Sequence, residues 1–188
     1  MAQQKNNPIM RSTHGMLGQQ IVFKGRAGKA YIAAPPTINK NRKPTAGQQA
    51  IRDRFKAAIT YATAAIKEPA ANRAYADRAK RGQIAHNVAF LDAFFPPVVQ
   101  GIITQGYHGR VGDLIVVHAQ DDFKVSAVRI SIHNAANELI EEVAATENLN
   151  GLSWSYVVTQ TNINVAGSKI KASAIDIPEN EGWLEVVL

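Results

Sequence analysis

The sequence contains no cysteine, and this absence excludes several classes of function. Disulfide bonds, thiolate metal sites, iron–sulfur clusters and cysteine nucleophiles all require the cysteine sulfur. Long apolar runs are also missing, since the longest, such as residues 114–117, have only a few residues, whereas a membrane-spanning helix needs about 20. Residues 1–8 are polar and lack the apolar stretch of a secretory signal. We therefore expect a soluble protein with no membrane partner.

Acidic residues are absent from residues 1–44, which carry eight lysines and arginines. Up to Asp92 there are 16 basic against four acidic residues, a net charge of +12, whereas from Ala93 onward there are five against 11, a net charge of −6. Opposite charge in the two halves indicates modules with different partners, which could also attract one another within a chain or between copies. The residues we expect to contact an anionic partner are Arg11, Lys24, Arg26, Lys29, Lys40, Arg42 and Lys43.

The basic segment has local features of a β-hairpin followed by an extended arm. Residues 18–23 and 29–33 are short β-like runs, and the connection between them has glycine at both ends, as hairpin loops often do. Residues 34–44 contain three prolines and no apolar periodicity. Arms of this composition commonly order only against a partner. The first expected module is therefore a basic arm over residues 1–44.

Helical periodicity begins at Thr45, where Thr45 and Gln48 fit the capping-box spacing. The apolar residues that follow have the spacing of one helical face: Ile51, Phe55, Ile59, Ala62 and Ile66. This pattern predicts a helix over residues 46–67, and Pro69 suits the first turn of a second helix. A third short helix is predicted before Pro96 and Pro97, with one apolar face formed by Ile84, Val88, Leu91 and Phe95. Residues 45–97 are thus expected to form a helical unit.

The periodicity changes to that of strands after residue 97. Seven short runs are predicted as strands, at residues 98–104, 113–119, 125–133, 138–145, 152–159, 169–176 and 183–187. In the third run apolar and polar residues alternate, as in an antiparallel sheet with one buried face. About seven strands in some 90 residues is typical of a β-sandwich. Leu152, Trp154, Tyr156 and Val158 share parity on one strand, which predicts that Trp154 belongs to the core.

Two parts of the chain resemble known proteins. The order of an Asp121-Asp122 run, a long strand, an acidic strand at residues 138–144 and a Trp154-Ser-Tyr156 strand resembles a bacterial or phage immunoglobulin-like domain without its disulfide. Residues 15–97, with Gly15, Gly28-Lys29 and the proline-rich basic arm, are similar to uncharacterised proteins of Bacteroidetes and their phages. These resemblances imply a virion structural protein with an immunoglobulin-like domain at residues 98–188.

The sequence motifs give little support for a catalytic or metal-binding site. The loop from Gly25 to Lys29 is too short for a phosphate-binding loop and is followed by alanine instead of serine or threonine. The five histidines are scattered, and no serine stands in a G-x-S-x-G motif. Asp121 and Asp122 could join Asp176 in binding calcium, although solvated turn residues are the more common case. We expect no enzyme activity, no cofactor and no metal site.

These observations predict an α+β multidomain protein in which a basic β-hairpin arm and a small helical unit precede an all-β immunoglobulin-like sandwich. The function expected first is that of a non-enzymatic phage virion protein, a head, neck or auxiliary component assembled in the host cytoplasm. Other virion proteins or further copies of the chain would be its partners. The alternative is a nucleic-acid-binding module that uses the basic segment to contact phosphates. A third class, a surface carbohydrate- or host-binding protein, would need an exposed aromatic residue such as Trp154 or Trp183.

Overall fold

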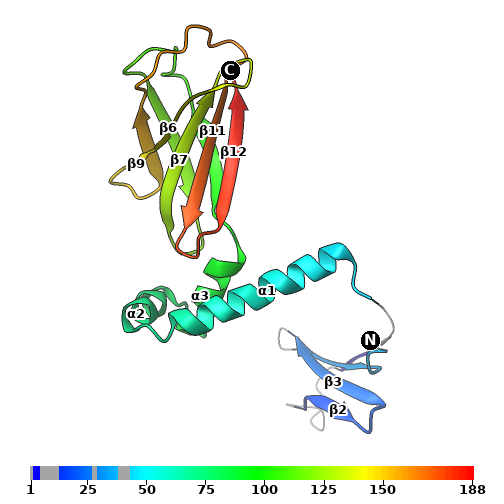
Figure 1. The fold of residues 1–188 in the computed structure, drawn as a ribbon. Helices are drawn as coiled ribbons and strands as arrows, with labels where there is room; N and C mark the ends of the chain where they lie inside the picture. Colours follow the sequence, from blue (N-terminus) through cyan, green and yellow to red (C-terminus); the bar gives the residue numbers. More distant parts are fainter. Residues whose placement is uncertain (1, 5–12, 27–28, 38–42) are drawn as a thin grey trace. The chain divides into compact units, whose positions relative to one another are not determined.

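A computed structural model describes residues 2–4, 13–26, 29–37 and 43–188. The chain divides into two compact units, Met1–Thr45 and Ala46–Leu188. The described residues form three helices and three sheets, so the chain is an α+β protein, as the sequence predicts (Figure 1). The second unit contains the helices together with two of the sheets.

The N-terminal unit contains a four-stranded antiparallel sheet in the order β1-β4-β3-β2. The strands are β1 (Ala2–Gln4), β2 (Gly15–Leu17), β3 (Ile21–Arg26) and β4 (Lys29–Ala33). The paired strands β3 and β4 form in the region of the predicted hairpin, but β3 continues to Arg26, where the sequence predicts a loop. Strands β1 and β2 were not predicted, because three residues are too few to show a period of two.

Three helices begin the second unit. They are α1 (Ala46–Ala65), α2 (Pro69–Arg78) and α3 (Ala85–Phe94). Pro69 occupies the first turn of α2, where its missing N–H is not needed. The helices pack around a small core of Ala62, Tyr75, Val88 and Ala89. None of the three combines the length and apolar character that crossing a membrane requires.

Two four-stranded antiparallel sheets follow the helices, and we call them together the two-sheet domain. One sheet has the order β5 (Val98–Ile103), β6 (Leu114–Gln120), β10 (Ser153–Val157) and β9 (Thr146–Glu147). The other has the order β12 (Glu181–Val187), β11 (Lys169–Asp176), β7 (Val125–His133) and β8 (Leu139–Ala144). The bounds of β7 and β11 match the predicted runs, whereas β9 was not predicted because it has only two residues.

The core of the two-sheet domain contains buried side chains from both sheets, so the sheets pack on one another. Ile115 and Val117 come from one sheet, and Ile130 and Ile170 come from the other. Trp154 is 3% exposed, which confirms its predicted place in the core. Tyr156 and Val158 are buried as well, but Leu152 is exposed because β10 begins only at Ser153. Leu152 therefore does not share the burial of the other three residues of that parity.

Candidate functional site

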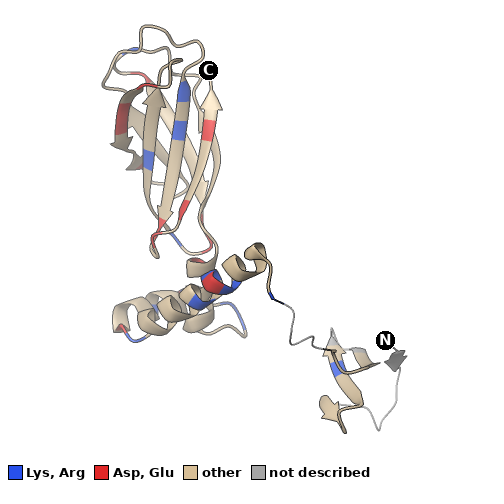
Figure 2. Ribbon diagram, turned by 45° about the vertical axis from the view of Figure 1, so that its right-hand side comes forward, with Lys and Arg blue, Asp and Glu red and all other residues tan. Residues whose placement is uncertain are grey.

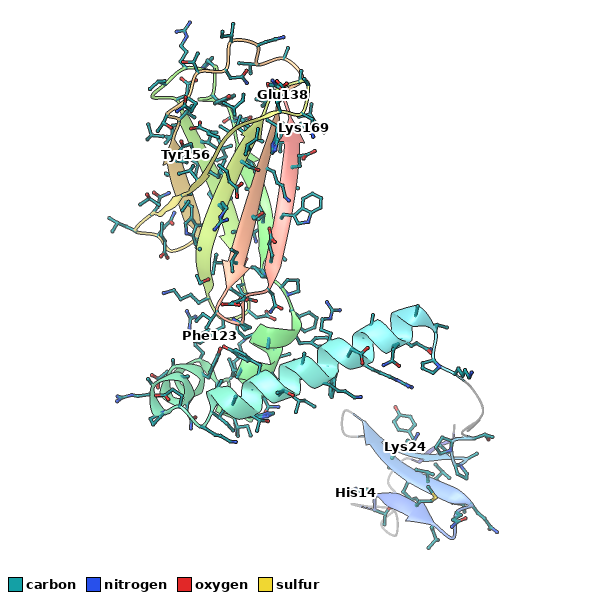
Figure 3. The ribbon with its side chains drawn as sticks, viewed as in Figure 1. His14, Lys24, Phe123, Glu138, Tyr156 and Lys169 are labelled. Atoms are coloured by element: carbon teal, nitrogen blue, oxygen red, sulfur yellow. The ribbon has the colours of Figure 1, made fainter. Side chains whose placement is uncertain are left out.

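The basic residues predicted to contact an anionic partner are only partly described by the structure. Lys24 is exposed on β3 and is labelled in Figure 3, and Lys43 is exposed before α1. Arg26 ends β3 and is paired with Lys29 at the start of β4. The predicted residues Arg11, Lys40 and Arg42 lie outside the described residues. The hairpin thus brings Lys24, Arg26 and Lys29 onto neighbouring strands.

One face of the N-terminal sheet is apolar. In the antiparallel register Leu17 lies opposite Ile21, and Phe23 lies opposite Ile32. Because residues two apart on a strand share a face, these four side chains lie on the same side of the sheet. Leu17 is 62% exposed and Ile21 is 38% exposed. No described side chain of this unit is buried, so the sheet has no core of its own among those residues.

A second exposed apolar surface lies on α1. Ile51, Phe55 and Ile59, predicted as the apolar face of this helix, are each at least 40% exposed. Phe55 packs edge-on against Phe90 of α3, with 5.0 Å between the ring centroids. The guanidinium carbon of Arg54 lies 4.9 Å from the centre of the Phe94 ring. Phe55 thus covers part of α3, and the apolar face of α1 still leaves apolar surface in contact with solvent.

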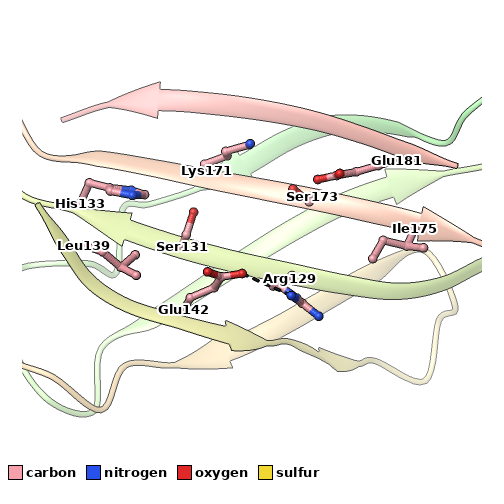
Figure 4. A pocket seen from close by; sticks show the side chains of 9 residues that line it. All are labelled: Arg129, Ser131, His133, Leu139, Glu142, Lys171, Ser173, Ile175 and Glu181. Atoms are coloured by element: carbon pink, nitrogen blue, oxygen red, sulfur yellow. Dashed lines mark hydrogen bonds and ion pairs between the residues drawn. The ribbon is translucent and has the colours of Figure 1, made fainter. Parts of the chain in front are cut away.

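The outer face of the sheet that contains β7 and β11 carries a shallow polar groove of about 450 Å³ (Figure 4). Its lining residues include Arg129 and Glu142, whose side chains form an ion pair at 3.4 Å. Trp183 lies opposite Ser173, another lining residue, and is 62% exposed, with the Lys171 ammonium 5.0 Å from its ring centre. Of the two tryptophans considered for ligand binding, only Trp183 is accessible, since Trp154 is buried.

Three aspartates meet where the helices adjoin the two-sheet domain, and we call this group the carboxylate junction. Asp92 comes from α3, Asp121 from the loop between β6 and β7, and Asp176 from the end of β11. One carboxylate oxygen of each lies within 4.8 Å of the corresponding oxygens of the other two. Asp92 and Asp176 are at most 1% exposed, while Asp121 is half-buried. Figure 2 shows the ribbon with acidic positions in red, and some of these lie at the end of the two-sheet domain next to the helices.

Hydrogen bonds hold each aspartate of the junction in place. The Tyr75 hydroxyl donates to Asp92 Oδ2 at 2.6 Å, and Tyr61 contacts the same Tyr75 hydroxyl at 2.9 Å. The backbone N–H groups of Phe123 and Lys124 donate to Asp121 Oδ2. Asn180 donates its backbone N–H to Asp176 Oδ1 and its side-chain amide to Asp176 Oδ2.

The same Asn180 amide connects the two-sheet domain to α3. It lies 3.3 Å from the main-chain carbonyl oxygens of Asp92 and Ala93. Nearby, the Phe123 ring packs on Tyr75 with 4.4 Å between centroids, and Phe123 is labelled at this end of the domain in Figure 3. The helices and the two-sheet domain are therefore joined by polar and aromatic contacts around the carboxylates.

Burial sets the protonation of the junction. It raises the pKa of Asp92 to about 7, the hydrogen bond from Tyr75 opposes this rise, and the neighbouring Asp121 adds to it. Burial also raises the pKa of Asp176, although its hydrogen bonds from Asn180 counteract the effect. The pKa of Tyr75 is raised far above its usual value by burial and by its bond to Asp92, so this hydroxyl stays a donor. Ionisation of these carboxyl groups in the folded protein therefore costs free energy.

Sequence reasoning identified part of this junction. It grouped Asp121 and Asp176 as possible calcium ligands, and the structure places both in the cluster. It added Asp122, which is exposed and is not a member of the cluster. It missed Asp92, although one signal was available: Asp92 is four residues after Val88, on the apolar face predicted for the third helix. A lone acid on such a face indicates a buried partner.

Comparisons with known proteins identify no family. No family model matches the chain, and no curated protein matches it. Among solved structures, an engineered protein has 14% identity and a TM-score of 0.28 over 39% of this chain. A tetra-tandem repeat from the extending region of a large adhesion protein has 19% identity and a TM-score of 0.32 over 49% of this chain. The matches span only 15% and 23% of those chains.

Proposed function

We propose that this chain is a non-enzymatic structural protein of a bacteriophage particle. In this proposal the N-terminal unit of one copy docks on the acidic two-sheet domain of the next copy. The helices and the two-sheet domain of each copy then form the body of the assembly. The observation that supports this most is the N-terminal sheet, which has an apolar face and basic residues but no buried side chain among its described residues.

A sheet of this size needs a covering surface. Small sheets become stable when a hydrophobic face packs against another element. The apolar side chains of Leu17, Ile21, Phe23 and Ile32 form such a face, and no second layer covers it among the residues of this unit that the structure describes. Docking on a neighbouring protein would remove this face from water and so stabilise both the sheet and the assembly.

Charge favours a second copy as the covering partner. Residues 1–44 carry eight basic residues and no acid, whereas the residues from Ala93 onward have a net charge of −6. Complementary charge steers association and fixes the register of an interface. A head-to-tail contact of this kind joins different surfaces on the two partners, so it can continue into rings or filaments. These are the forms that particle proteins take.

We also propose that the two-sheet domain is immunoglobulin-like. Immunoglobulin constant domains place their strands in two sheets, A-B-E-D and C-F-G. With β5 as the first strand, the sheet β5-β6-β10-β9 has the order A-B-E-D, and β7-β11-β12 has the order C-F-G with β8 added at the edge. The buried Trp154 supplies a core aromatic, and no disulfide is needed. Such a domain suits display on a particle, and the placement in a virion rests on the resemblances of the sequence.

Sedimentation velocity of the full chain tests the docking of copies. We expect association that increases with protein concentration at low ionic strength. It should weaken in about 1 M salt, where the Debye length is only about 3 Å. Docking of the N-terminal unit within its own chain would instead give a monomer at every concentration, and this result would contradict the proposal.

Two matched variants locate the interface. Leu17→Glu places a charge on the apolar face of the sheet, and we expect it to weaken association at least tenfold, about 1.4 kcal/mol. Met16→Glu places the same charge on the opposite face, where Met16 lies across from Val22, and the proposal predicts association near that of the unsubstituted chain. Equal loss in both variants would show that the apolar face is not the contact.

The nucleic-acid alternative predicts a different result with the same protein. If about six basic residues contact phosphates, the logarithm of the affinity for duplex DNA should fall with the logarithm of salt concentration with a slope of about −5. We expect only weak binding at physiological salt, on the order of 10 μM or weaker. Tight DNA binding that persists at physiological salt, without self-association, would favour the alternative.

A further inference from the structure

Two oxygens of the carboxylate junction accept no hydrogen bond when all three carboxylates are ionised. Among the described residues three buried side-chain oxygens are unpaired, and two of them are Asp92 Oδ1 and Asp121 Oδ1. Asp92 is fully buried, so bulk water cannot solvate its unpaired oxygen. Buried polar atoms in native proteins are paired with a donor or bound to an ion in the great majority of cases. A cation or a proton-bearing group at the junction would therefore supply the partner that these oxygens lack.

No side chain of the described part of the protein supplies that positive charge. The ion pairs found there join Arg129 to Glu142 and Lys169 to Glu185, away from the junction. Three carboxylates within 4.8 Å of one another repel strongly when ionised, and the repulsion is greater in a buried place than in water. Buried charges persist when they are paired or coordinate a metal.

The spacing of the oxygens suits one cation. Calcium binds oxygen at about 2.3–2.6 Å, so two ligands on opposite sides of the ion lie about 4.6–5.2 Å apart. The three aspartate oxygens lie within 4.8 Å of one another, a spacing compatible with one calcium ion between them. The Asn180 amide, which donates to Asp176 Oδ2, also donates to the main-chain carbonyls of Asp92 and Ala93.

We propose that the carboxylate junction of Asp92, Asp121 and Asp176 is a binding site for a calcium ion. The ligand class is a hard divalent cation, since all the donors are oxygens. Calcium is favoured over magnesium, because calcium accepts irregular sets of carboxylates and carbonyls, whereas magnesium demands an octahedron and retains its waters. From the sequence, Asp121, Asp122 and Asp176 were considered as calcium ligands but no metal site was expected, and Asp92 was omitted.

Binding at this position fastens the helices to the two-sheet domain. The three carboxylates come from α3, from the loop that follows β6 and from the end of β11, so one ion joins three separate segments. Phe123, two residues after Asp121, packs on Tyr75 of α2 and extends the same contact. Without the ion, repulsion among the carboxylates opposes this contact. Calcium therefore sets how firmly the two parts hold together.

A proton is the alternative occupant of the unpaired oxygens. A proton shared between Asp92 and Asp121 would also relieve the repulsion between these two carboxylates. The two occupants compete, because calcium binds the deprotonated carboxylates. Calcium affinity should therefore rise with pH, and a junction that holds only a proton would show no calcium binding at any pH.

Titration of the full chain with calcium chloride, after treatment with EDTA, tests the proposal. By isothermal titration calorimetry we expect one site with a Kd on the order of 0.1 mM, in the range of extracellular calcium modules. At 100 times the Kd, the unfolding midpoint should rise by about 5–10 °C. Terbium is a second probe: excitation of tyrosine should sensitise its emission, since the Tyr75 hydroxyl contacts Asp92 directly.

Adjacent aspartates provide the variant and its control. Asp121→Asn removes one carboxylate from the junction and should weaken calcium binding at least tenfold and abolish the terbium emission. Asp122→Asn removes an exposed carboxylate one residue away and should leave both signals unchanged. Circular dichroism without calcium verifies that both variants are folded. No binding by the unsubstituted chain up to about 10 mM calcium, or equal loss in the two variants, would overturn the proposal.

Discussion

The carbonyl oxygen of Pro97 occupies the space that a β-carbon on Gly182 would require. Pro97 lies between α3 and β5, and Gly182 lies at the start of β12. The link that leaves the helices therefore passes directly against the last strand of the two-sheet domain. Only glycine allows this approach, because the obstructing atom belongs to the backbone and cannot move aside as a side chain would.

Substitution of Gly182 by alanine should therefore destabilise the second unit. We expect a loss of about 1–3 kcal/mol in the free energy of unfolding, measured by urea denaturation. Gly101→Ala on β5 is the control, since nothing lies within 4 Å of the β-carbon it would add. Its effect should stay within about 0.5 kcal/mol. Equal effects of the two substitutions would show that β12 does not pack tightly on the link.

The buried carboxylate of Asp92 predicts a stability that depends on pH. Its pKa is raised from 3.8 to about 7 in the folded protein, so the folded state binds more protons than the unfolded state between these values. The stabilisation is fully present below about pH 4 and is lost as the pH rises through about 7. In EDTA, the contribution of Asp92 should fall by more than about 1 kcal/mol over this range.

Asp92→Asn isolates this contribution, because asparagine does not ionise. The groups that face Asp92 are Asp121, Asp176 and Tyr75, and all of them remain in the variant. Urea denaturation from pH 5 to pH 8 should show a smaller loss of stability for Asp92→Asn than for the unsubstituted chain. Asp122→Asn should retain the original pH dependence. A slope unchanged by Asp92→Asn would refute the assignment.

The two tryptophans should differ in their contribution to stability. Trp154 is 3% exposed in the core, so Trp154→Ala should cost about 3–5 kcal/mol in the free energy of unfolding. Trp183 is 62% exposed, so Trp183→Ala should cost less than about 1 kcal/mol. Chemical denaturation of both variants gives the comparison, and similar losses would place Trp154 outside the core.

Long periodic elements were predictable from the sequence, and short or tertiary features were not. The helices and seven strands of the second unit have apolar patterns of sufficient length to be detected, and β7 and β11 match their predicted bounds. Strands β1, β2 and β9 have two or three residues and show no measurable period. Charge asymmetry identified the basic segment, but the placement of Arg11, Lys40 and Arg42 stays a prediction.

The carboxylate junction shows why a site of this kind escapes sequence reasoning. Asp92 is 29 residues from Asp121 and 84 residues from Asp176 in the chain. Their approach depends on how α3 packs against two loop regions of the two-sheet domain. Asp121 and Asp176 could be grouped from the sequence because both lie next to the ends of predicted strands. Grouping Asp92 with them also required knowledge of how α3 packs. The exposure of Ile51 and Phe55 on α1 likewise depends on how α1 packs against other elements, which the apolar pattern of the helix does not show.

The two-sheet domain should fold without the helices. Every buried residue of its core lies between Val99 and Ala174, so a fragment of residues 98–188 retains the complete core. We expect this fragment to be a monomer with the circular dichroism spectrum of a β protein. It should be less stable than residues 46–188, because the contacts of Asn180 and Phe123 with the helices are lost. A random-coil spectrum would show that the domain boundary is wrong.

The central claim is that the basic N-terminal segment is an assembly device, and deletion of residues 1–44 tests it most directly. The measurement is the amount of full-length and truncated protein incorporated into purified particles, with circular dichroism to verify that the truncated protein is folded. We predict that the deletion abolishes incorporation while the second unit remains folded, because residues 46–188 form a compact unit by themselves. Normal incorporation of the folded, truncated protein would contradict the claim.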